Sequence, residues 1–451
     1  MLTNAPLNIA VIGSGISGLA AAWMLTRQRH RVTVYESATW AGGHSHTVTI
    51  PTPDGERAVD TGFIVYNEPA YPNLTALFKH LGVTTVPTSM GFAVSLDNGA
   101  YEYSGNDLGG IFGQASNIVS ARHWRMLNDT RRFFKAAEAA QNIVGDDLTL
   151  GQFLQQNRFG QDFIDRHILP MAAAIWSAPA GEMPGFPAAA FFRFFSNHGL
   201  LKLAGRPVWR TVVGGSKVYV EAMRAAFGDG LRLGRGAKSV GWHEGHAVVR
   251  DRTGTVETFD HAVIATHADD ALRLIDDPSA DERRLLGQFR YSENKVVLHT
   301  DERLMPTRRR VWSSWNYLGA SDKQSPAIIT YWMNALQPLE TRQNIFISLN
   351  PGDKITAGAE LQNFVYHHPV FDRAALAAQR QLWSLQGRNG RWFAGSYFGY
   401  GFHEDGLQSG LAVAEEFGAA RRPWTVDSPS SRVIALSGRV AAAAGAYAEV
   451  R

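Results

Sequence analysis

Three glycines near the amino-terminal end have the spacing of a loop that binds a diphosphate. Gly13, Gly15 and Gly18 form a G-x-G-x-x-G loop, which follows the apolar run 8–12 and opens a run of helix-forming residues. A second β-branched run ends on Glu36, 18 residues after Gly18. Strand, glycine loop, helix and acid in this order are typical of a dinucleotide-binding fingerprint, in which the acid binds ribose hydroxyls.

Each residue of the loop has its own physical role. Gly13 allows the tight turn off the strand, Gly15 lets main chain approach a pyrophosphate, and Gly18 lets the helix pack on the sheet. The predicted helix, 19–28, follows the loop, and the free N–H groups and positive dipole end at its start, beside Ile16 and Ser17, attract phosphate. The alternative is a glycine-rich turn in an ordinary strand–helix unit, which does not require the acid.

A second glycine pair follows the acid closely. Gly42 and Gly43 precede His44, and a Thr-Gly62-Phe63 sequence comes a little later. A domain that binds a nicotinamide dinucleotide does not require this second pair. The pattern therefore favours a different dinucleotide.

The other stretch that could do chemistry is a loop near the carboxyl-terminal end. An apolar strand ends at Gly395, and a loop then leads to His403, Glu404 and Asp405 before the predicted helix 411–417. His403 and Glu404 are candidate acid/base residues, since either could carry protons beside a redox group. Either could equally be a hydrogen-bonding loop residue. Asp405 is expected to cap the helix.

Composition limits the classes of function. A chain of 451 residues suggests two domains, and 45% hydrophobic with 19% charged residues indicates a globular protein. The net charge of +3 comes without a dense basic block, so we expect no nucleic-acid partner. The absence of cysteine excludes disulfides, thiolate nucleophiles and thiolate metal sites. The histidines lack the spacing of a metal site or of a Ser-His-Asp hydrolase, so no metal is predicted.

The sequence also bears on location. The first predicted strand begins by Asn8, which leaves no room for a signal peptide, and no apolar run approaches the ~18 residues of a membrane span. We therefore expect a cytoplasmic protein and leave peripheral contact with the inner face of the membrane open.

The elements that must position these residues divide the chain into two groups of segments. We expect one discontinuous α/β domain, Rossmann-like, formed by residues 1–82, 207–289 and 386–451. An inserted substrate domain is expected from residues 83–206 and 290–385, with an antiparallel sheet and a mainly helical part over 106–206.

An aromatic run within the helical part allows two interpretations. Residues 186–203 contain five phenylalanines with few charges between them. The run could form the wall of an apolar substrate tunnel or a face that touches lipid. It could also be an ordinary buried core helix, because a helix that is apolar nearly all round must be covered.

Together these stretches resemble the flavin amine oxidoreductase superfamily, whose members bind FAD in an extended form. The resemblance implies an amine-oxidase-like fold with FAD as the cofactor. It also implies cofactor contacts by Ser37, Gly42, Gly43, Gly62, Phe63, Gly395, Asp405, Gly406 and Leu407. His44 stands where the family has an arginine, and a backbone contact to adenine is expected near Ala237. Lys295, by its place in the domain order, is a candidate for the lysine found beside the flavin in many amine oxidases, although a solvated lysine is the alternative.

A closer resemblance covers most of the chain. It rests on the phrases at residues 175–177, 197–201, 210–216, 298–301, 314–317, 368–369 and 401–406. They resemble bacterial FAD-binding amine-oxidoreductase-like proteins that are often encoded beside cyclopropane-fatty-acid synthases. This implies a small-molecule substrate with an unsaturated or modified fatty acyl chain, and desaturation, dehydrogenation or double-bond isomerisation. Two alternatives stay open: an FAD amine oxidase that makes hydrogen peroxide, and a non-catalytic flavin-bound partner of a lipid-modifying enzyme. The oligomeric state is not predicted.

Overall fold

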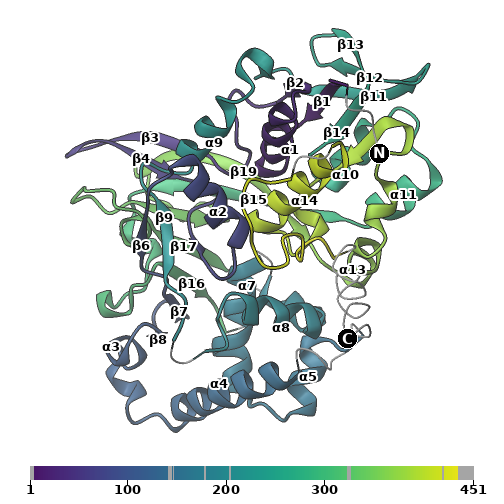
Figure 1. Ribbon diagram of the computed structural model, residues 1–451. Coiled ribbons are helices and arrows are strands. Elements are labelled where there is room, and N and C mark those ends of the chain that lie inside the picture. The colour runs from purple at the N-terminus through teal and green to yellow at the C-terminus, as the bar shows by residue number, and fades with distance from the viewer. Residues whose placement is uncertain are drawn as a thin grey trace.

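The structure is a computed structural model (Figure 1). It describes residues 5–140, 145, 147–176, 179–202, 205–321, 327–418 and 421–434. Residue 203 of the aromatic run, residue 177 of a phrase quoted above and residues 435–451 of the predicted α/β domain lie outside these ranges.

A parallel sheet of five strands forms one part of the molecule, in the order β10-β2-β1-β14-β20. Its strands are β1 (Asn8–Ile12), β2 (Arg31–Tyr35), β10 (Leu231–Arg232), β14 (His261–Ile264) and β20 (Arg391–Phe393). The central strand β1 is buried from Ile9 to Ile12, as a near-continuous apolar run must be when both faces of a parallel sheet are covered. The sheet confirms the predicted Rossmann-like fold.

Helices and a small antiparallel sheet surround this parallel sheet. The helices are α1 (Ile16–Arg27), α2 (Pro72–Leu81), α9 (Lys217–Arg224), α10 (Ala268–Leu274), α11 (Ala280–Leu286), α13 (Arg373–Gln379) and α14 (His403–Glu416). The antiparallel strands are β11 (Ala237–His243), β12 (His246–Asp251) and β13 (Val256–Phe259). Helix α2 ends at Leu81, because Gly82 adopts the left-handed conformation that closes a helix.

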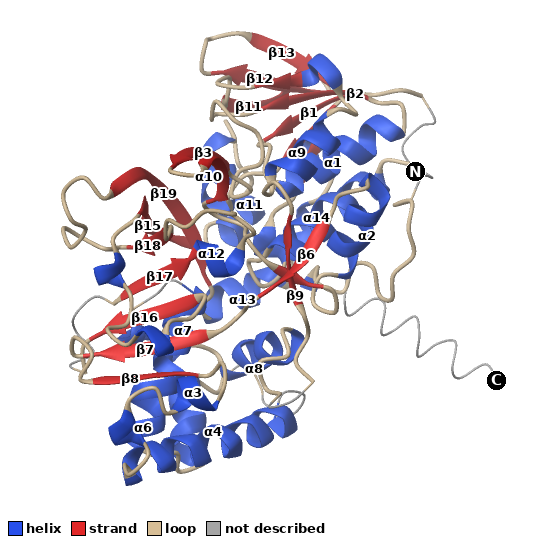
Figure 2. Ribbon diagram, turned by 90° about the vertical axis from the view of Figure 1, so that its left-hand side faces the viewer, coloured by secondary structure: helices blue, strands red, loops and turns tan. Residues whose placement is uncertain are grey.

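A second sheet of seven strands has the order β19-β15-β18-β17-β16-β7-β8. Its strands are β7 (Phe92–Leu96), β8 (Tyr101–Ser104), β15 (Arg290–His299), β16 (Trp315–Gly319), β17 (Ile328–Trp332), β18 (Phe346–Leu349) and β19 (Glu360–Val370), with the short helix α12 (Met333–Leu336). All neighbours are antiparallel except β7 and β16. The long pair β15–β19 forms one edge of this sheet (Figure 2).

Smaller strands connect the two parts. The hairpin of β3 (Thr47–Thr52) and β4 (Gly55–Asp60) follows the second glycine pair. A three-stranded sheet combines β5 (Tyr66–Asn67), β9 (Trp209–Val212) and β6 (Thr85–Thr88). These strands bring the segment around Phe63 back toward the start of α9.

The segment 106–206 is mainly helical, as predicted, and covers one end of the seven-stranded sheet (Figures 1 and 2). Its helices are α3 (Leu108–Ile111), α4 (Ala121–Ala140), α5 (Leu150–Gln156), α6 (Gln161–Phe163), α7 (Leu169–Trp176) and α8 (Ala188–Asn197). A π-helical turn, Ile164–Ile168, joins α6 to α7.

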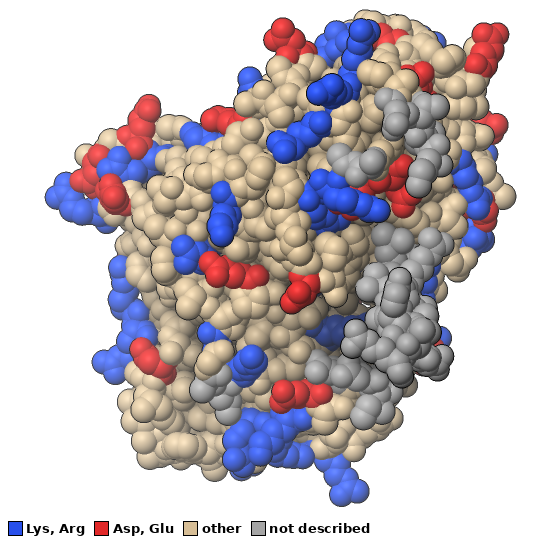
Figure 3. Space-filling view, in the orientation of Figure 1, with Lys and Arg blue, Asp and Glu red and all other residues tan. Residues whose placement is uncertain are grey.

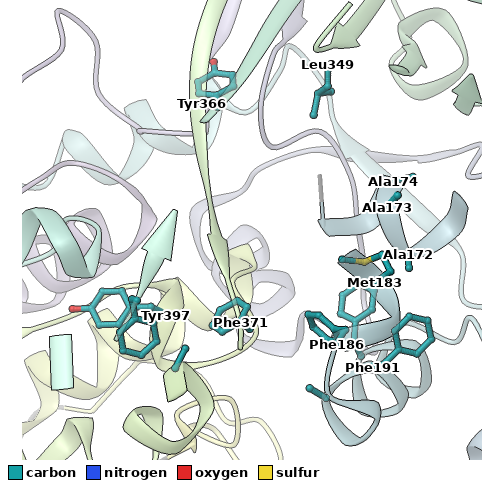
Figure 4. Close-up of a cluster of buried hydrophobic side chains, with 14 of the residues drawn as sticks. Ala172, Ala173, Ala174, Met183, Phe186, Phe191, Leu349, Tyr366, Phe371 and Tyr397 are labelled. Atoms are coloured by element: carbon teal, nitrogen blue, oxygen red, sulfur yellow. The ribbon is translucent and has the colours of Figure 1, made fainter. Parts of the chain in front are cut away.

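The aromatic run forms α8 and lies in the core. Phe191, Phe192 and Phe195 are fully buried; Phe191 packs against Phe133 of α4, and Phe192 packs against Phe153 of α5. Figure 4 shows Phe186 and Phe191 of this cluster beside the alanines of α7. The interpretation of α8 as a lipid-touching face is therefore wrong, because the phenylalanines already have protein partners.

Among the described helices, none combines the length and the hydrophobicity that a membrane-spanning segment requires.

Candidate cofactor site and active site

The amino-terminal glycine loop has the geometry that its spacing predicts. Gly13 has a φ of +98°, and a Cβ there would lie 2.8 Å from the Ala265 carbonyl oxygen. A Cβ on Gly18 would collide with the Gly13 carbonyl, so this glycine lets α1 start close to the sheet. A Cβ on Gly15 would meet nothing within 4 Å. The space in front of Gly15 is therefore open to a ligand.

Glu36 is fixed beside this loop. Its Oε2 accepts hydrogen bonds from the backbone N–H and the hydroxyl of Ser14, at 2.8 and 2.6 Å. Its Oε1 accepts one from the Ala38 N–H at 2.8 Å. Ser14 occupies a variable position of the motif, so the spacing of the glycines does not predict its role. Its contacts orient the carboxylate at the end of β2, where a ribose would be bound.

A cavity of about 320 Å³ opens beside the loop and next to Glu36. Gly13, Ser37 and Ala237 all line it. Its further lining residues are Ile12, Tyr35, Gly236, Lys238, Arg252, Thr266, Asp270, Arg273 and Leu274. The predicted contacts at Ser37 and Ala237 therefore lie on one cavity with the loop, and its place fits the adenosine end of a dinucleotide.

The second glycine pair packs on the first loop. The N–H of Gly42 donates to the Ser14 carbonyl at 3.0 Å, and a Cβ on Gly43 would lie 3.1 Å from the Cα of Gly15. Farther along, the N–H of Phe63 donates to the carbonyl of His44 at 2.7 Å, and a Cβ on Gly62 would collide with that carbonyl. The structure thus brings these predicted residues together.

The start of α14 crosses the start of α1. A Cβ on Gly406 would lie 2.8 Å from Ile16 Cγ2 and 2.9 Å from Ser17 Oγ, and a Cβ on Gly410 would collide with the Ser17 carbonyl. Leu407 is fully buried in this contact region. The positive ends of two helix dipoles therefore lie close together, which favours an anionic ligand between them.

The strand end before α14 is fixed by Ser409. The N–H of Gly395 donates to Ser409 Oγ at 3.0 Å, and this hydroxyl donates to the Gly395 carbonyl at 3.1 Å. Gly395 therefore holds the strand against the helix.

Asp405 caps α14, as its sequence position predicts. Its Oδ2 accepts a hydrogen bond from the Phe402 N–H at 2.8 Å. Burial raises the pKa of this carboxyl to about 6, against the opposing effect of Arg432, whose Nη1 lies 4.0 Å away.

His403 lies in a buried network. Its ring stacks on Phe63, with ring centroids 3.9 Å apart and planes inclined by 9°. Its Nε2 is 2.5 Å from the hydroxyl of Tyr219 and 3.2 Å from that of Ser45, and these two hydroxyls share a short hydrogen bond. Burial lowers the pKa of His403 to about 3, so the imidazole is neutral near pH 7. Tyr219 is 184 positions away in the chain, and no motif marks it.

Glu404 points away from this network. Its Oε1 accepts hydrogen bonds from the Asn73 N–H and side-chain amide, each at 2.9 Å, and from Gln408 at 2.7 Å. Its Oε2 accepts one from the Leu74 N–H at 2.9 Å. Burial raises the pKa of this carboxyl. Glu404 therefore caps the first turn of α2, and this geometry argues against the acid/base role expected from the sequence.

Histidines surround His44. Its ring lies 4.9 Å from that of Tyr366, 5.7 Å from that of His368 and 6.2 Å from that of His267. Burial lowers the pKa of His44 well below its usual value, and the neighbouring histidines add to the effect. Its Nε2 is buried without a hydrogen-bond partner among the described residues. Such an atom calls for a ligand in the site, which fits a cofactor acceptor.

Lys295 does not join these residues. It lies on β15, where its N–H donates to Asn350 Oδ1 at 2.9 Å, and its side chain is exposed. The geometry matches the solvated lysine that the sequence left as the alternative.

A small acidic cluster lies beside the cavity. Ligand atoms of His267, Asp269 and Asp270 lie within 4.8 Å of one another. Both carboxylates also pair with Arg273, which already supplies positive charge. The cluster therefore carries no metal assignment.

Comparisons with known proteins agree with this geometry. A family model described as "Flavin containing amine oxidoreductase" matches residues 16–349. The chain is 25% identical over 271 residues to a Mycobacterium tuberculosis protein provisionally named flavin-containing monoamine oxidase AofH. That alignment covers 57% of this chain and 56% of the relative, so the match spans little more than half of its length.

Two solved structures share the fold across almost the whole chain. The CLA-producing fatty acid isomerase of P. acnes has a TM-score of 0.68 at 16% identity, covering 93% of this chain and all of the isomerase chain. A variant of putrescine oxidase has a TM-score of 0.68 at 15% identity, covering 91% of this chain and 98% of the oxidase. The family model and the glycine loops agree on FAD as the cofactor. The chain belongs to the flavin-containing amine oxidoreductase family.

Proposed function

We propose that this FAD-dependent enzyme acts on an unsaturated or modified fatty acyl chain, as a dehydrogenase or a double-bond isomerase. Bound FAD would supply a hydride acceptor for the chain and, in an isomerisation, a hydride donor to another carbon. The residues that would hold FAD are those of the glycine loop 13–18, the glycine pair 42–43, Glu36 and the start of α14. The observation that carries the proposal is an apolar wall that reaches the residue before His403.

The wall starts in the buried aromatic cluster. Phe194 of α8 stacks on Phe402, with ring centroids 4.6 Å apart, and Phe402 directly precedes His403. Behind Phe194, Trp176 packs 4.6 Å from Phe186 and 5.1 Å from Phe194. Such an apolar cluster next to a redox site would suit a hydrocarbon chain, which gains free energy from leaving water.

The carboxylates of this region are already engaged. Asp60 accepts hydrogen bonds from Ser216 and Gln337, Glu404 caps α2, and Asp405 caps α14. A protonated amine would need a carboxylate or aromatic faces to replace its hydration. A cation in this region would therefore depend mainly on the aromatic faces, whereas an uncharged chain needs no partner for a charge.

His403, Tyr219 and Ser45 have a proposed role in proton transfer. The neutral imidazole can accept a proton at one nitrogen while it gives one up at the other, so the network can pass a proton without burying a charge. Phe63 fixes the plane of the ring. These residues would take the proton that accompanies hydride loss in a dehydrogenation.

A second candidate function is an FAD amine oxidase that makes hydrogen peroxide. It is favoured by the family model and by the fold shared with putrescine oxidase. A third, a non-catalytic flavin-bound partner of a lipid-modifying enzyme, predicts a flavin that neither class of substrate changes.

The test is anaerobic mixing of the FAD-loaded protein with oleoyl and linoleoyl lipids and, separately, with putrescine and monoamines. The flavin absorbance reports reduction, and gas chromatography of the recovered acyl chains reports moved or new double bonds. We expect acyl lipids to bleach the flavin or to return with altered double bonds. Bleaching by amines alone would replace the proposal with the oxidase, and unchanged flavin with unchanged lipids would favour the non-catalytic partner.

A further inference from the structure

A group of large apolar side chains is exposed at the end of the molecule formed by α3 and α4. Val119 is 86% exposed, Leu108 74%, Ile118 55% and Trp124 51%. Single exposed apolar residues are common, whereas several in one place indicate an interaction surface. We call Leu108, Phe112, Ile118, Val119 and Trp124 the α3–α4 face.

Contacts show that these residues form one surface. The indole N–H of Trp124 donates to the Ile118 carbonyl at 2.9 Å, and its ring lies 5.2 Å from that of Phe112. The N–H of Phe112 donates to the carbonyl of Leu108 in the same short helix. This hydrogen bond holds the indole of Trp124, the bulkiest group on the face, in an exposed position.

Basic side chains continue the face. Arg131 and Lys135 follow Trp124 by 7 and 11 positions along α4, so they lie on the same stripe of the helix, and both are exposed. On the other flank, a Cβ on Gly113 would lie 3.3 Å from Arg310 Cγ, which places an exposed arginine beside α3. Figure 3 shows Lys and Arg side chains gathered at this end of the molecule.

Nearby acidic groups cancel only part of this charge. Asp162 pairs with Arg122 at 2.7 Å, whereas Asp107 keeps its negative charge while it caps α3 by accepting the Gly110 N–H at 2.7 Å. Glu138 lies one turn beyond Lys135 and ends the basic stripe.

We propose that the α3–α4 face docks on a lipid bilayer that carries anionic headgroups. Tryptophan and aliphatic side chains insert at the headgroup level, and the basic residues bind the anionic surface, as in other interfacial segments. The charge complementarity selects this occupant over a second copy of the chain, because two such faces would repel each other. The inference concerns the surface and does not rest on the reaction proposed above.

The test is flotation of the full-length FAD-loaded protein with vesicles of phosphatidylglycerol and phosphatidylcholine, and with vesicles of phosphatidylcholine alone. We expect binding to the anionic vesicles, with weaker binding at high salt. Val119→Asp should reduce the partition coefficient about tenfold or more, since it puts a charge among the inserting side chains. Reversing Arg131 and Lys135 to Glu should also reduce it, by at least about fivefold for each charge.

The matched control is Val256→Asp. Val256 is 46% exposed on β13, at the opposite end of the molecule (Figure 2), and its change should leave binding unaltered. Flavin absorbance and circular dichroism show that each variant is folded. The proposal is overturned if the wild-type protein ignores anionic vesicles or if Val119→Asp floats as well as the wild type does. It is also overturned if light scattering shows a dimer that Val119→Asp dissociates, because a second copy then covers the face.

Discussion

Phe63 and His403 stack face to face, with ring centroids 3.9 Å apart, although 340 positions separate them in the chain. The stack joins the segment after the second glycine pair to the first residue of α14. Because the two residues come from two segments that meet at the proposed cofactor site, their contact fixes how these segments lie against each other. Substitutions at either residue should therefore affect FAD binding and the proton network together.

The open space at Gly15 predicts a change that affects the ligand more than the fold. Gly15→Val should raise the Kd for FAD by at least about tenfold, because the new side chain occupies the space meant for the pyrophosphate. The unfolding midpoint of the apoprotein should stay within a few degrees of the wild type, since a Cβ at this position meets no protein atom within 4 Å. Fluorescence titration with FAD and thermal unfolding measure the two effects. Gly18→Val is the contrasting variant and should destabilise the apoprotein itself.

Glu404 should act on stability through α2. In Glu404→Ala the buried donors of Asn73, Leu74 and Gln408 lose their acceptor, which should lower the free energy of unfolding by about 3 kcal/mol. Glu404→Gln keeps one acceptor oxygen and should lose about half as much. Urea unfolding at constant FAD saturation gives both values. Equal stability of Glu404→Ala and the wild type would contradict the capping role.

The hydrogen bond between Tyr219 and His403 predicts an energetic coupling. Tyr219→Phe and His403→Phe each remove this hydrogen bond. The free energy of unfolding that the double variant loses should be smaller, by about 1 kcal/mol, than the sum of the losses of the two single variants. A double-mutant cycle from urea unfolding tests this. The same variants should slow substrate-dependent flavin reduction, and additive losses with unchanged reduction rates would exclude a working network.

Buried histidines predict weaker folding in acid. Burial lowers the pKa of His403 and of His198 to about 3, so the unfolded chain takes up protons below pH ~6.5 that the native state refuses. Their stabilising contribution is complete above pH 6.5 and is lost as the pH falls toward 3. Each should contribute a slope of about 1.4 kcal/mol per pH unit in this window. The free energy of unfolding, measured at pH 7, 6, 5 and 4, should therefore depend less steeply on pH in His403→Phe than in the wild type.

Two buried carboxyls, those of Asp60 and Asp405, change the stability with pH in the opposite direction to the histidines. Burial raises the pKa of Asp60 and of Asp405 to about 6, so the native state binds these protons more tightly than the unfolded chain does. Their contribution is complete below pH ~4 and is lost as the pH rises through 6. In Asp60→Asn this opposing effect is absent, so the free energy of unfolding should rise more steeply from pH 4 to pH 6 than in the wild type. A shallower rise would contradict the raised pKa.

Lys295 offers a direct test of a sequence-based hypothesis. Its exposed side chain predicts that Lys295→Met changes the flavin spectrum little and the rate of flavin reduction by less than about twofold. A residue that positions water beside the flavin would instead cost about 100-fold or more. The rate of flavin reduction, measured by stopped flow, distinguishes these two outcomes.

The sequence predicted those parts of the site that depend on neighbours in the chain. Gly13, Gly15 and Gly18 form one local turn, and their spacing alone fixes the path of the backbone. Tyr219 could not be predicted, because an ordinary helix carries it to His403 from another segment. The role of Glu404 was also hidden, since its donors belong to α2, far away in the sequence. Composition alone could not distinguish the wall of an apolar substrate tunnel from a packed core. Phenylalanine side chains are stabilised by burial in either environment.

The crossing of α1 and α14 has a consequence for how the protein matures. The two segments that we propose bind the pyrophosphate, residues 13–18 and 403–410, lie far apart in the sequence. A ribosome-bound chain therefore lacks the second of them until residues 403–410 have been synthesised. Flavin loading is consequently expected only after α14 has been synthesised and has packed on α1.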